Sequence, residues 1–360
     1  MGHSSSPSLA VRTTLGVGGP AARIMNAASV TEVREAARSA AGSGLPLFVM
    51  GGGSNLLVSD AGFPGVVLSL SGDRLELRPD GTVIADAGVA WERLVDAAVA
   101  ADLAGVECLT GIPGTVGAAP IQNIGAYGQE VADTLVRVRA WDRVDEVEVT
   151  LEAEDCGFAY RDSRFKHSPE RFVVLAVELR LKPGGVPCTR YDEVRRAVPG
   201  SKDAPPTLLQ VRAAVRTLRR GKGMLLESTT MPAPNTRSAG SFFTNPIVCA
   251  AAAAELPPAA PKHPAGSGLV KVAAAWLIEH AGIQRGFALG RAAISTQHTL
   301  ALVNLGGATS DEVVRLAAWV RRAVRRRFGL TLSPEPVFLG FDAPPADVLD
   351  AAERTLPDVA

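Results

Sequence analysis

Several features that would point to a particular class of protein are missing from this sequence of 360 residues. Its 37 basic and 37 acidic residues cancel, and no tract concentrates the positive charge that nucleic acid or an anionic membrane requires. The four cysteines are scattered and form no C-x-x-C pair, which argues against a zinc site and against a disulfide framework. No apolar run reaches the roughly 18 residues of a membrane span, and the start of the chain has no apolar signal segment.

These absences narrow the class of protein. We expect a protein of the reducing cytoplasm, with no nucleic-acid partner, no membrane insertion and no bound metal. We also expect a monomer. A chain of this length exceeds what one hydrophobic core usually supports, so two domains are expected. A proline-rich stretch marks the boundary between them. The expected division is an N-terminal segment 1–18, a first domain 19–185, a linker 186–206, a second domain 207–342 and a C-terminal tail 343–360.

The sequence alternates between helical and strand patterns. Ser29 caps a helical pattern over 29–41, and residues 74–89 predict a hairpin that turns at Asp80-Gly81. The pattern from 91 predicts a helix that ends at Gly105. Residues 250–267 are expected to be a loose insert, and the tail is expected to be polar. In the helix predicted for 309–329, five arginines are expected on a solvated face: Arg321, Arg322, Arg325, Arg326 and Arg327.

Two glycine-rich segments could bring backbone N–H groups close to a ligand. The first, VMGGGSNLLV, follows a strand, and its glycines allow the backbone to approach a pyrophosphate; a tight turn is the alternative. The second, GIPGTVGAAPIQNIGAYG, is too rich in glycine and proline for a regular element, and its alternative is a buried structural loop. No G-K-[ST] follows the first segment, which excludes a Walker A loop.

Three further residues are candidates for chemistry. Arg161 lies among aromatic residues and could bind a carboxylate, although the motif taken alone favours an ordinary surface salt bridge. Glu335 lies between two prolines, where partial burial would suit it to act as an acid; the alternative is an exposed turn residue. Ser241, in SAGSFFTNP, could be a cap, a nucleophile or a proton donor. It has no G-x-S-x-G elbow, which argues against a serine hydrolase.

Seven motifs together resemble the UDP-N-acetylenolpyruvoylglucosamine reductase family. They are TLGVGGPA, GGGSNLLV, GIPGTVGAAPIQNIGAYG, YRDSRFK, AGSFFTNP, AAAWLIEHAG and PEPVF, which occur in the family's order between about residues 13 and 340. The resemblance implies an α+β fold, with an FAD-binding domain of the vanillyl-alcohol oxidase type followed by a C-terminal α+β substrate-binding domain.

The resemblance also implies roles for individual residues. Arg161, Ser241 and Glu335 match the family's catalytic set. Tyr191 matches the mobile tyrosine of the family's long form. Asn245, Lys222, Lys271 and His298 fall at substrate contacts, and His298 stands where some members have glutamine. The residues implied to hold FAD are Gly51, Gly52, Gly53, Ser54, Asn55, Leu56, Thr110, Ile112, Pro113, Gly114, Val116, Gly117, Ala118, Ile121, Gln122, Asn123, Gly125, Ala126 and Tyr127.

The implied reaction is the NADPH-dependent, FAD-mediated reduction of UDP-N-acetylglucosamine enolpyruvate to UDP-N-acetylmuramate, a step in peptidoglycan precursor synthesis. A hydride from flavin N5 would add to the enolpyruvyl CH2, and Ser241 would then protonate C2. NADPH and the sugar nucleotide would use the same cleft in turn. Two alternatives stay open: a related FAD-dependent alcohol oxidase, and a noncatalytic protein that binds a nucleotide sugar.

Overall fold

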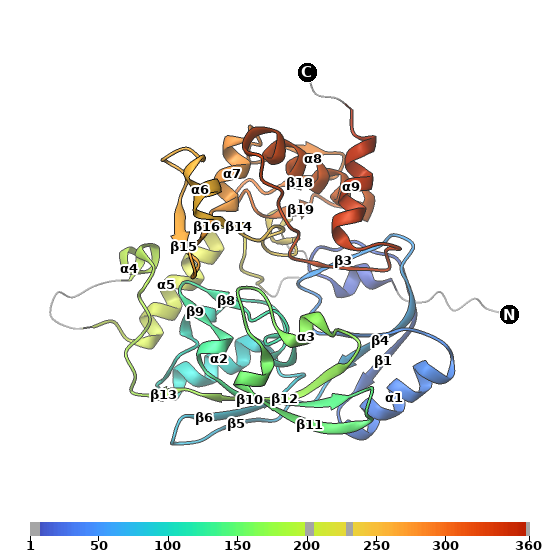
Figure 1. Ribbon diagram of the computed structural model, residues 1–360. Helices are drawn as coiled ribbons and strands as arrows, with labels where there is room; N and C mark the ends of the chain where they lie inside the picture. The colour runs from blue at the N-terminus through green and yellow to red at the C-terminus, as the bar shows by residue number, and fades with distance from the viewer. Residues whose placement is uncertain (1–7, 199–204, 228–232, 358–360) are drawn as a thin grey trace. The chain divides into compact units, whose positions relative to one another are not determined.

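The computed structural model describes residues 8–198, 205–227 and 233–357 (Figure 1). The chain divides into two compact units. The first unit comprises Ala21–Gly53 and Pro64–Leu226, and the second comprises Met1–Pro20, Ser54–Phe63 and Glu227–Ala360. Parts of the predicted N-terminal segment, the linker, the stretch at 224–237 and the tail lie outside the described residues.

This division differs from the boundaries expected from the sequence. The helix that begins just after the predicted linker packs in the first unit, and the segment 54–63 packs in the second. The predicted boundary rested on proline content, which marks where regular structure stops but does not reveal which core a following helix joins.

The first unit is built on two sheets. A three-stranded sheet has the order β1 (Ala21–Ala27), β4 (Phe63–Leu70), β2 (Leu47–Met50). An antiparallel sheet of five strands has the order β11 (Val147–Glu152), β10 (Leu135–Asp142), β12 (Phe172–Arg180), β6 (Thr82–Asp86), β5 (Leu75–Leu77). Two short pairs complete it: β13 (Lys182–Pro183) with β7 (Leu103–Ala104), and β8 (Gly125–Ala126) with β9 (Gln129–Glu130).

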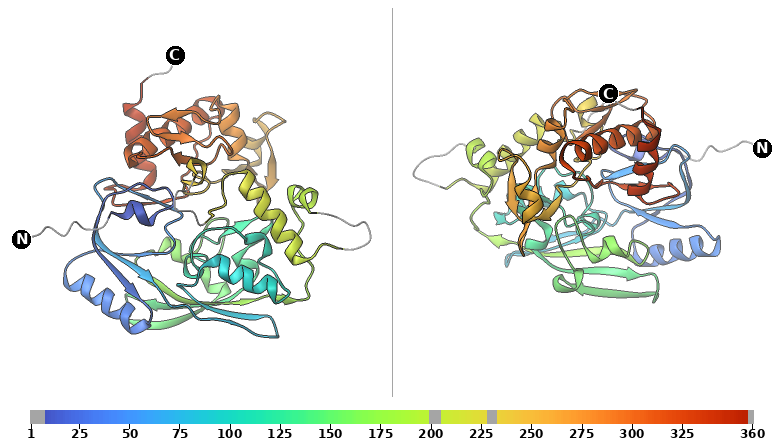
Figure 2. Two further views of the ribbon diagram at one scale, coloured as in Figure 1. Left: turned by 180° about the vertical axis from the view of Figure 1, so that it is seen from behind. Right: turned by 45° about the horizontal axis from the view of Figure 1, so that its top comes forward.

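The helices of the first unit follow from local sequence signals. They are α1 (Val30–Gly42), α2 (Trp91–Ala100), α3 (Arg164–His167), α4 (Asp192–Ala197) and α5 (Leu208–Gly221), with 3-10 turns η2 (Glu107–Leu109), η3 (Val116–Ala118), η4 (Val131–Asp133) and η5 (Ala153–Cys156). Ser29 and Glu32 form a capping box at the start of α1, which confirms the predicted helix start. Helix α1 packs beside β1 and β2 (Figure 2).

The hairpin predicted for 74–89 is confirmed, because β5 and β6 pair antiparallel and Gly81 at the turn has a φ of 85°. The predicted end of the helix that begins at Trp91 was wrong. Helix α2 ends at Ala100, because Asp102 has a left-handed φ of 54° and the next two residues form β7. The buried face of α2, formed by Trp91, Leu94 and Val95, belongs to the same core as β6, β10 and β12.

The second unit is assembled from short elements. They are η1 (Leu9–Arg12), β3 (Leu56–Val58), η6 (Pro234–Thr236), β14 (Ile247–Cys249), α6 (Ala250–Ala254), β15 (Lys262–Pro264), β16 (Leu269–Val272), α7 (Ala274–His280), β17 (Ala288–Leu289), β18 (Ala292–Ile294), β19 (Leu302–Asn304), α8 (Ser310–Phe328), β20 (Val337–Leu339) and α9 (Pro345–Thr355). The sheets have the orders β14-β16-β15 and β17-β18-β19, and β20 pairs parallel with β3. Helix α8 packs against β17–β19, α7 and α9 (Figure 2).

Two expectations for this unit were wrong. The insert predicted to be loose forms α6 and β15, and β15 pairs with β16. Hydrogen bonds between the two backbones stabilise β15, so the strand does not depend on a strand pattern in its side chains. The second wrong expectation is part of the solvated face of α8. Arg321 and Arg322 are buried against α9, which the tail forms, whereas Arg325, Arg326 and Arg327 are exposed, as expected. Arg321 binds Asp350 at 3.0 Å, and Arg322 donates to the carbonyl of Pro357 at 2.8 Å.

A buried asparagine joins distant segments of the second unit. Asn304 is 3% exposed, and its Nδ2 donates to the carbonyls of Leu15 and Gly16, both at 3.1 Å. Its Oδ1 accepts from the backbone N–H groups of Gly306 at 2.8 Å and Ala308 at 3.0 Å. One side chain therefore satisfies four backbone groups, two of them buried and two partly buried. Among the described residues, no helix has both the length and the apolar character needed to cross a membrane.

We expect Asn304→Ala to destabilise the protein by on the order of 3 kcal/mol, because several buried backbone groups lose their partners at once. Urea unfolding followed by circular dichroism measures this loss. Asn26→Ala is the control, since Asn26 is exposed on β1 and its replacement should change the unfolding free energy by less than about 0.5 kcal/mol. Equal midpoints for the two variants would contradict the role given to Asn304.

Candidate active site

The two glycine-rich segments meet within the first unit. A side chain at Gly52 would place its Cβ 2.8 Å from the Cα of Gly114, and one at Gly51 would place it 2.9 Å from the Cβ of Ala118. Real Cβ atoms do not approach other atoms this closely, so glycine is required where the loops touch. The segment predicted from 110 to 128 is an ordered loop, as expected, and it packs directly on residues 51 and 52.

The second loop is also fixed to the start of α2. The N–H of Val116 donates to the carbonyl of Val89 at 2.8 Å, and the N–H of Trp91 donates to the carbonyl of Gly114 at 3.0 Å. At Gly117 a Cβ would lie 2.4 Å from that of Ala87, so this position also requires glycine. The backbone of both loops is therefore held by packing and hydrogen bonds within the first unit.

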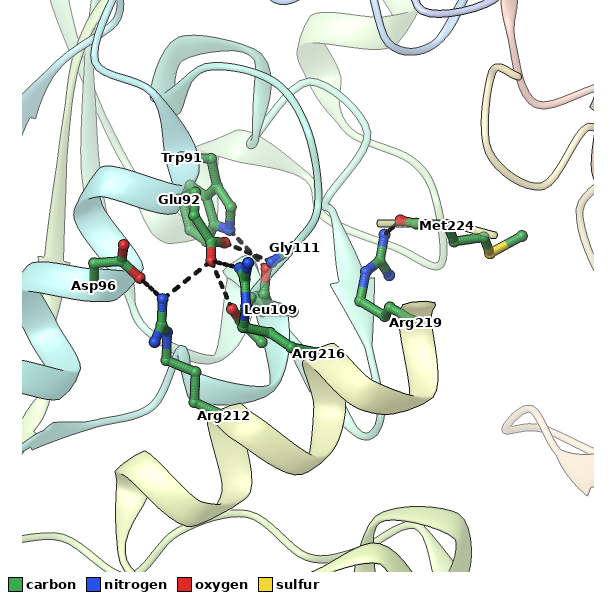
Figure 3. A network of polar contacts seen from close by, with 10 residues as sticks. Trp91, Glu92, Asp96, Leu109, Gly111, Arg212, Arg216, Arg219 and Met224 are labelled. Carbon is green, nitrogen blue, oxygen red and sulfur yellow. Dashed lines mark hydrogen bonds and ion pairs between the residues drawn. The ribbon is translucent and has the colours of Figure 1, made fainter. Parts of the chain in front are cut away.

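A carboxylate on α2 binds the beginning of this loop (Figure 3). Glu92 accepts hydrogen bonds from the hydroxyl of Thr110 at 2.9 Å and from the N–H of Gly111. Two arginines of α5 converge on the same carboxylate: Arg212 at 3.3 Å and Arg216. Glu92 therefore joins the loop to α5.

The same helix contributes two more contacts. Arg212 also pairs with Asp96, and Arg219 donates to the carbonyl of Met224 at 3.0 Å (Figure 3). Burial lowers the pKa of Arg219. The sequence analysis missed this network. The spacing of Arg212, Arg216 and Arg219 places them on one helix face, but Glu92, the partner of Arg212 and Arg216, lies 120 residues or more away in the chain.

Arg161 contacts the second glycine-rich loop. Its Nη2 donates to the carbonyl of Gly125 at 2.6 Å, and its Nη1 donates to that of Asn123 at 3.4 Å. The guanidinium also lies over the ring of Tyr160, at 5.5 Å from the centroid. The loop that the sequence assigns to FAD therefore orients the arginine assigned to catalysis.

Three residues in and beside the second glycine-rich loop have a strained backbone. Asn123, Tyr127 and Arg161 have φ values of 46°, 50° and 56°, a left-handed region that residues other than glycine rarely adopt. The surrounding structure must hold them there, and such strain is typical of functional sites. The buried side chain of Asn123 helps, because its Nδ2 donates to Glu130 at 2.9 Å and its Oδ1 accepts from the N–H of Ala132 at 2.9 Å.

Three predicted ligand-binding residues lie together: Tyr127, Tyr191 and Lys222. The ring of Tyr191 contacts that of Tyr127 edge to face, with centroids 6.2 Å apart. The ammonium group of Lys222 lies 5.2 Å from the centroid of the Tyr127 ring and pairs with Glu193 at 2.7 Å. Burial raises the pKa of Tyr127, so its phenol stays protonated at neutral pH. Tyr191 is 50% exposed, which leaves much of its ring accessible to a ligand.

In the second unit, Ser241 and Glu335 come together. The N–H of Glu335 donates to the carbonyl of Phe242 at 2.9 Å, next to Ser241 in the chain. Asn55 joins them, because its Nδ2 donates to the carbonyl of Glu335 at 3.3 Å and its own carbonyl accepts from the N–H of Val337 at 3.0 Å. Ser241 and Glu335 are both half-buried, and Gly240 before the serine has a φ of 72°.

The remaining predicted substrate contacts of the second unit are three polar side chains. Asn245 accepts a hydrogen bond from the N–H of Ala274, at the start of α7, at 2.9 Å. Lys271 lies on β16 opposite Ile247. His298 accepts from the N–H of Leu300 at Nδ1, at 3.1 Å. All three are half-buried.

The predicted set thus divides between the units. The first unit holds Arg161, Tyr191, Lys222 and the predicted FAD contacts Gly51–Gly53 and 110–127, including Ile112, Pro113, Ile121, Gln122, Gly125 and Ala126. The second unit holds Ser54, Asn55, Leu56, Ser241, Asn245, Lys271, His298 and Glu335. Within the described part of the chain, no cluster of three or more His, Cys, Asp or Glu side chains could hold a metal ion.

We expect Gly52→Ala to force the two glycine-rich loops apart, because the obstructing atoms belong to the backbone. The variant should lose about 2 kcal/mol of unfolding free energy. Thermal unfolding of Gly42→Ala provides the control, since a Cβ at Gly42 meets no atom within 4 Å and alanine favours α1 by up to about 1 kcal/mol. A Gly52 variant as stable as the control would refute the close packing.

We expect Glu92→Gln to destabilise the protein by about 2 kcal/mol, because the two arginines lose the charge that neutralises them. Glu76→Gln is a matched control. Glu76 also pairs with two arginines, Arg74 and Arg78, but at the surface, where such pairs contribute little. Urea unfolding compares the two variants, and equal losses would show that the Glu92 network is no more than a surface ion pair.

Two family models match the chain. The model described as the C-terminal domain of UDP-N-acetylenolpyruvoylglucosamine reductase matches residues 232–339, and the model described as an FAD binding domain matches residues 21–151. Together with the mixed helices and sheets, these matches confirm the predicted fold class, an α+β chain with an FAD-binding domain of the vanillyl-alcohol oxidase type and a C-terminal domain of this reductase.

Curated relatives and a solved structure agree with the family models. The UDP-N-acetylenolpyruvoylglucosamine reductase of Thermobifida fusca is 47% identical over 349 residues, which cover 92% of this chain and 96% of the relative. That of Streptomyces avermitilis is 45% identical over 350 residues, covering 93% and 94%. The crystal structure of the enzyme from Thermus caldophilus aligns with a TM-score of 0.63 at 28% identity, over 92% of this chain and 97% of that one. The chain therefore belongs to the UDP-N-acetylenolpyruvoylglucosamine reductase family of FAD-dependent oxidoreductases.

Proposed function

We propose that the protein reduces UDP-N-acetylglucosamine enolpyruvate to UDP-N-acetylmuramate with electrons from NADPH, as a step in peptidoglycan precursor synthesis in the cytoplasm. The observation that carries the proposal is that two predicted catalytic residues, Ser241 and Glu335, lie on adjacent backbone segments of the domain that matches this reductase. The names of the relatives support the substrate. We expect the protein to act as a monomer.

The glycine-rich loops of the first unit fit FAD. Their glycines remove the side chains that would keep the two backbones apart, and residues 51–53 and 110–127 would hold the cofactor. When bound, FAD carries the hydride between NADPH and the substrate. We assign cofactor binding mainly to the first unit and substrate binding mainly to the second unit, with Tyr191 and Lys222 contributed by the first.

The reaction requires this chain to stabilise negative charge and to deliver a proton. Hydride addition to the enolpyruvyl CH2 places charge at C2 and in the neighbouring carboxylate. Arg161 and Glu335 would stabilise that charge, Arg161 as a cation and Glu335 as an acid. The carbonyls of Asn123 and Gly125 orient the guanidinium of Arg161 for this task.

Ser241 would donate the proton to C2. A serine hydroxyl is a weak acid, so it can act only toward a strongly basic carbon and only if it is held in position. Buried Phe242 and Phe243 fix the segment after Ser241, with ring centroids 5.2 Å apart. Gly240 before the serine has a φ of 72°, a conformation that glycine adopts readily, and this sets the course of the backbone into Ser241.

The remaining side chains would bind the sugar nucleotide. Lys222 and Lys271 supply positive charge for a diphosphate, and Asn245 and His298 supply hydrogen-bonding groups. Tyr191 would close on the ligand from its exposed position beside Tyr127.

We expect Ser241→Ala to keep flavin reduction by NADPH but to lose reoxidation by the enolpyruvyl substrate, because only the second step needs the proton. The loss should be about 100-fold to 1,000-fold, or roughly 3–4 kcal/mol of barrier. Stopped-flow absorbance at the flavin band separates the two steps.

Ser241→Cys is the matched variant, since a thiol retains a proton that it can donate, and it should reoxidise faster than Ser241→Ala. Normal reoxidation of the alanine variant would overturn the role of Ser241. A purified protein whose flavin is reduced by an alcohol and reoxidised by oxygen, rather than reduced by NADPH and reoxidised by the enolpyruvyl nucleotide, would indicate the alternative, an FAD-dependent alcohol oxidase.

A further inference from the structure

Two of the four cysteines meet in the first unit, although they are 80 residues apart in the chain. Cys108 is fully buried in η2, and Cys188 is half-buried in the segment before α4. The thiol of Cys108 donates to the carbonyl of Cys188 at 3.3 Å, and the thiol of Cys188 donates to the carbonyl of Tyr127 at 3.8 Å. The fold therefore pairs thiols that the sequence analysis described as scattered.

The backbone of Cys188 is held by two consecutive residues of η2. Its N–H donates to Oε1 of Glu107 at 2.7 Å, and its carbonyl accepts from Cys108. Glu107 is fully buried, and its Oε2 accepts from the N–H of Gly105 at 2.8 Å. Both backbone polar groups of Cys188 are thus bound to the same short turn.

This anchor lies next to a predicted ligand-binding residue. Cys188 precedes Tyr191 by three positions, and between them Arg190 donates to the carbonyl of Gly128 at 3.0 Å. Tyr191 then contacts Tyr127. Whatever fixes Cys188 on η2 therefore limits how far Tyr191 can move.

The two thiols differ in acidity. The neighbouring Cys108 thiol lowers the pKa of Cys188 to about 6, and Arg190 adds to this effect, whereas burial and Glu107 oppose it. The pKa of Cys108 is raised, first by the neighbouring Cys188 and then by burial. The lowered pKa favours the thiolate at Cys188, and the raised pKa favours the thiol at Cys108.

Cys188 also lines an open cavity of about 530 Å³ in the first unit. Four cationic side chains line the same cavity: Arg180, Lys182, Arg190 and Arg195. Cys188 is therefore the more accessible residue of the pair, while Cys108 is fully buried. By contrast, Cys156 is buried, its thiol donates to the carbonyl of Glu152 at 3.3 Å, and burial raises its pKa to about 11.

We propose that Cys108 and Cys188 form a peroxide-reactive thiol pair, and that their oxidation to a disulfide fixes the segment carrying Tyr191 to η2. The oxidation of the two thiols does not depend on the proposed function. Only the expected effect on turnover rests on the proposed function.

The reaction balances with hydrogen peroxide as the oxidant. The thiolate of Cys188 attacks one peroxide oxygen, so that an S–O bond forms, the O–O bond breaks and hydroxide leaves to become water. The sulfur of Cys108 then attacks the sulfenic sulfur of Cys188, an S–S bond forms and a second water leaves. Two thiols and one peroxide give one disulfide and two waters, and the two electrons pass from sulfur to peroxide.

The first experiment treats the purified holoprotein with hydrogen peroxide, blocks remaining thiols with N-ethylmaleimide and identifies linked peptides by mass spectrometry without reduction. We expect two of the four thiols to disappear together and a peptide joining Cys108 to Cys188 to appear. Cys156→Ser is the control and should give the same linked peptide. Oxidation that begins at exposed Cys249 and yields no such link would overturn the proposal.

Variants test the roles of the two sulfurs. In Cys108→Ala, dimedone should trap Cys188 as the sulfenic acid, because no second thiol resolves it. Iodoacetamide at pH 7 should alkylate Cys188 about tenfold more slowly in this variant, since the neighbouring thiol that lowers the pKa of Cys188 is gone. In Cys188→Ser, Cys108 should stay unmodified by peroxide. Cys188→Ser replaces a half-buried residue, so it can be used if Cys108→Ala fails to fold. Oxidation of Cys108 in the Cys188→Ser variant would overturn the assignment of Cys188 as the thiol that attacks peroxide.

The effect on Tyr191 needs a separate measurement. Oxidised wild-type protein should turn over the enolpyruvyl substrate at least tenfold more slowly, and dithiothreitol should restore the rate, whereas Cys188→Ser should not respond to peroxide. A disulfide that forms without changing turnover would overturn the fixing of Tyr191. If the protein does not turn over this substrate at all, the proposed function fails, but the linked peptide still decides the thiol pair.

Discussion

The close contact between two glycine-rich loops is the constraint on which the first unit depends. Gly51 and Gly52 lie against the backbone of Gly114 and the side chain of Ala118 at distances that no Cβ could tolerate. Once this contact is made, the second loop can follow the start of α2, and its later residues can carry the carbonyls that orient Arg161. The position of the Arg161 side chain therefore depends on glycines elsewhere in the two loops.

Buried or half-buried polar side chains fix the irregular segments of both units in the same way. Glu92 binds the start of the second glycine-rich loop, Glu107 binds the segment before Tyr191, and Asn304 binds the N-terminal residues of the second unit. Each uses a carboxylate or an amide to satisfy backbone groups that no helix or strand supplies with partners. A chain whose functional segments are loops needs such anchors, because loops cannot satisfy their own backbone.

Local signals in the sequence predicted the elements that depend on neighbouring residues. The capped start of α1 and the turn at Gly81 came from spacing alone, and the family came from motifs whose order is preserved. The burial of Arg321 could not be predicted, because it depends on the packing of α9 against α8. That packing is a contact between helices and leaves no local signal in the sequence of either one. The contact of Cys108 with Cys188 likewise depends on long-range packing, which spacing does not encode. The grouping of Ser241 with Glu335 within one unit became visible only in the fold.

The last helix has a practical meaning for anyone who shortens or tags this chain. Leu349 and Leu356 belong to the hydrophobic core of the second unit, and the guanidiniums of Arg321 and Arg322 are covered by α9. A chain cut near residue 343 would expose apolar surface and two cations whose partners have been removed, which favours aggregation during expression. A fusion partner joined beyond Pro357 would leave these contacts intact. The segment that looks most dispensable in the sequence is therefore a poor place to trim.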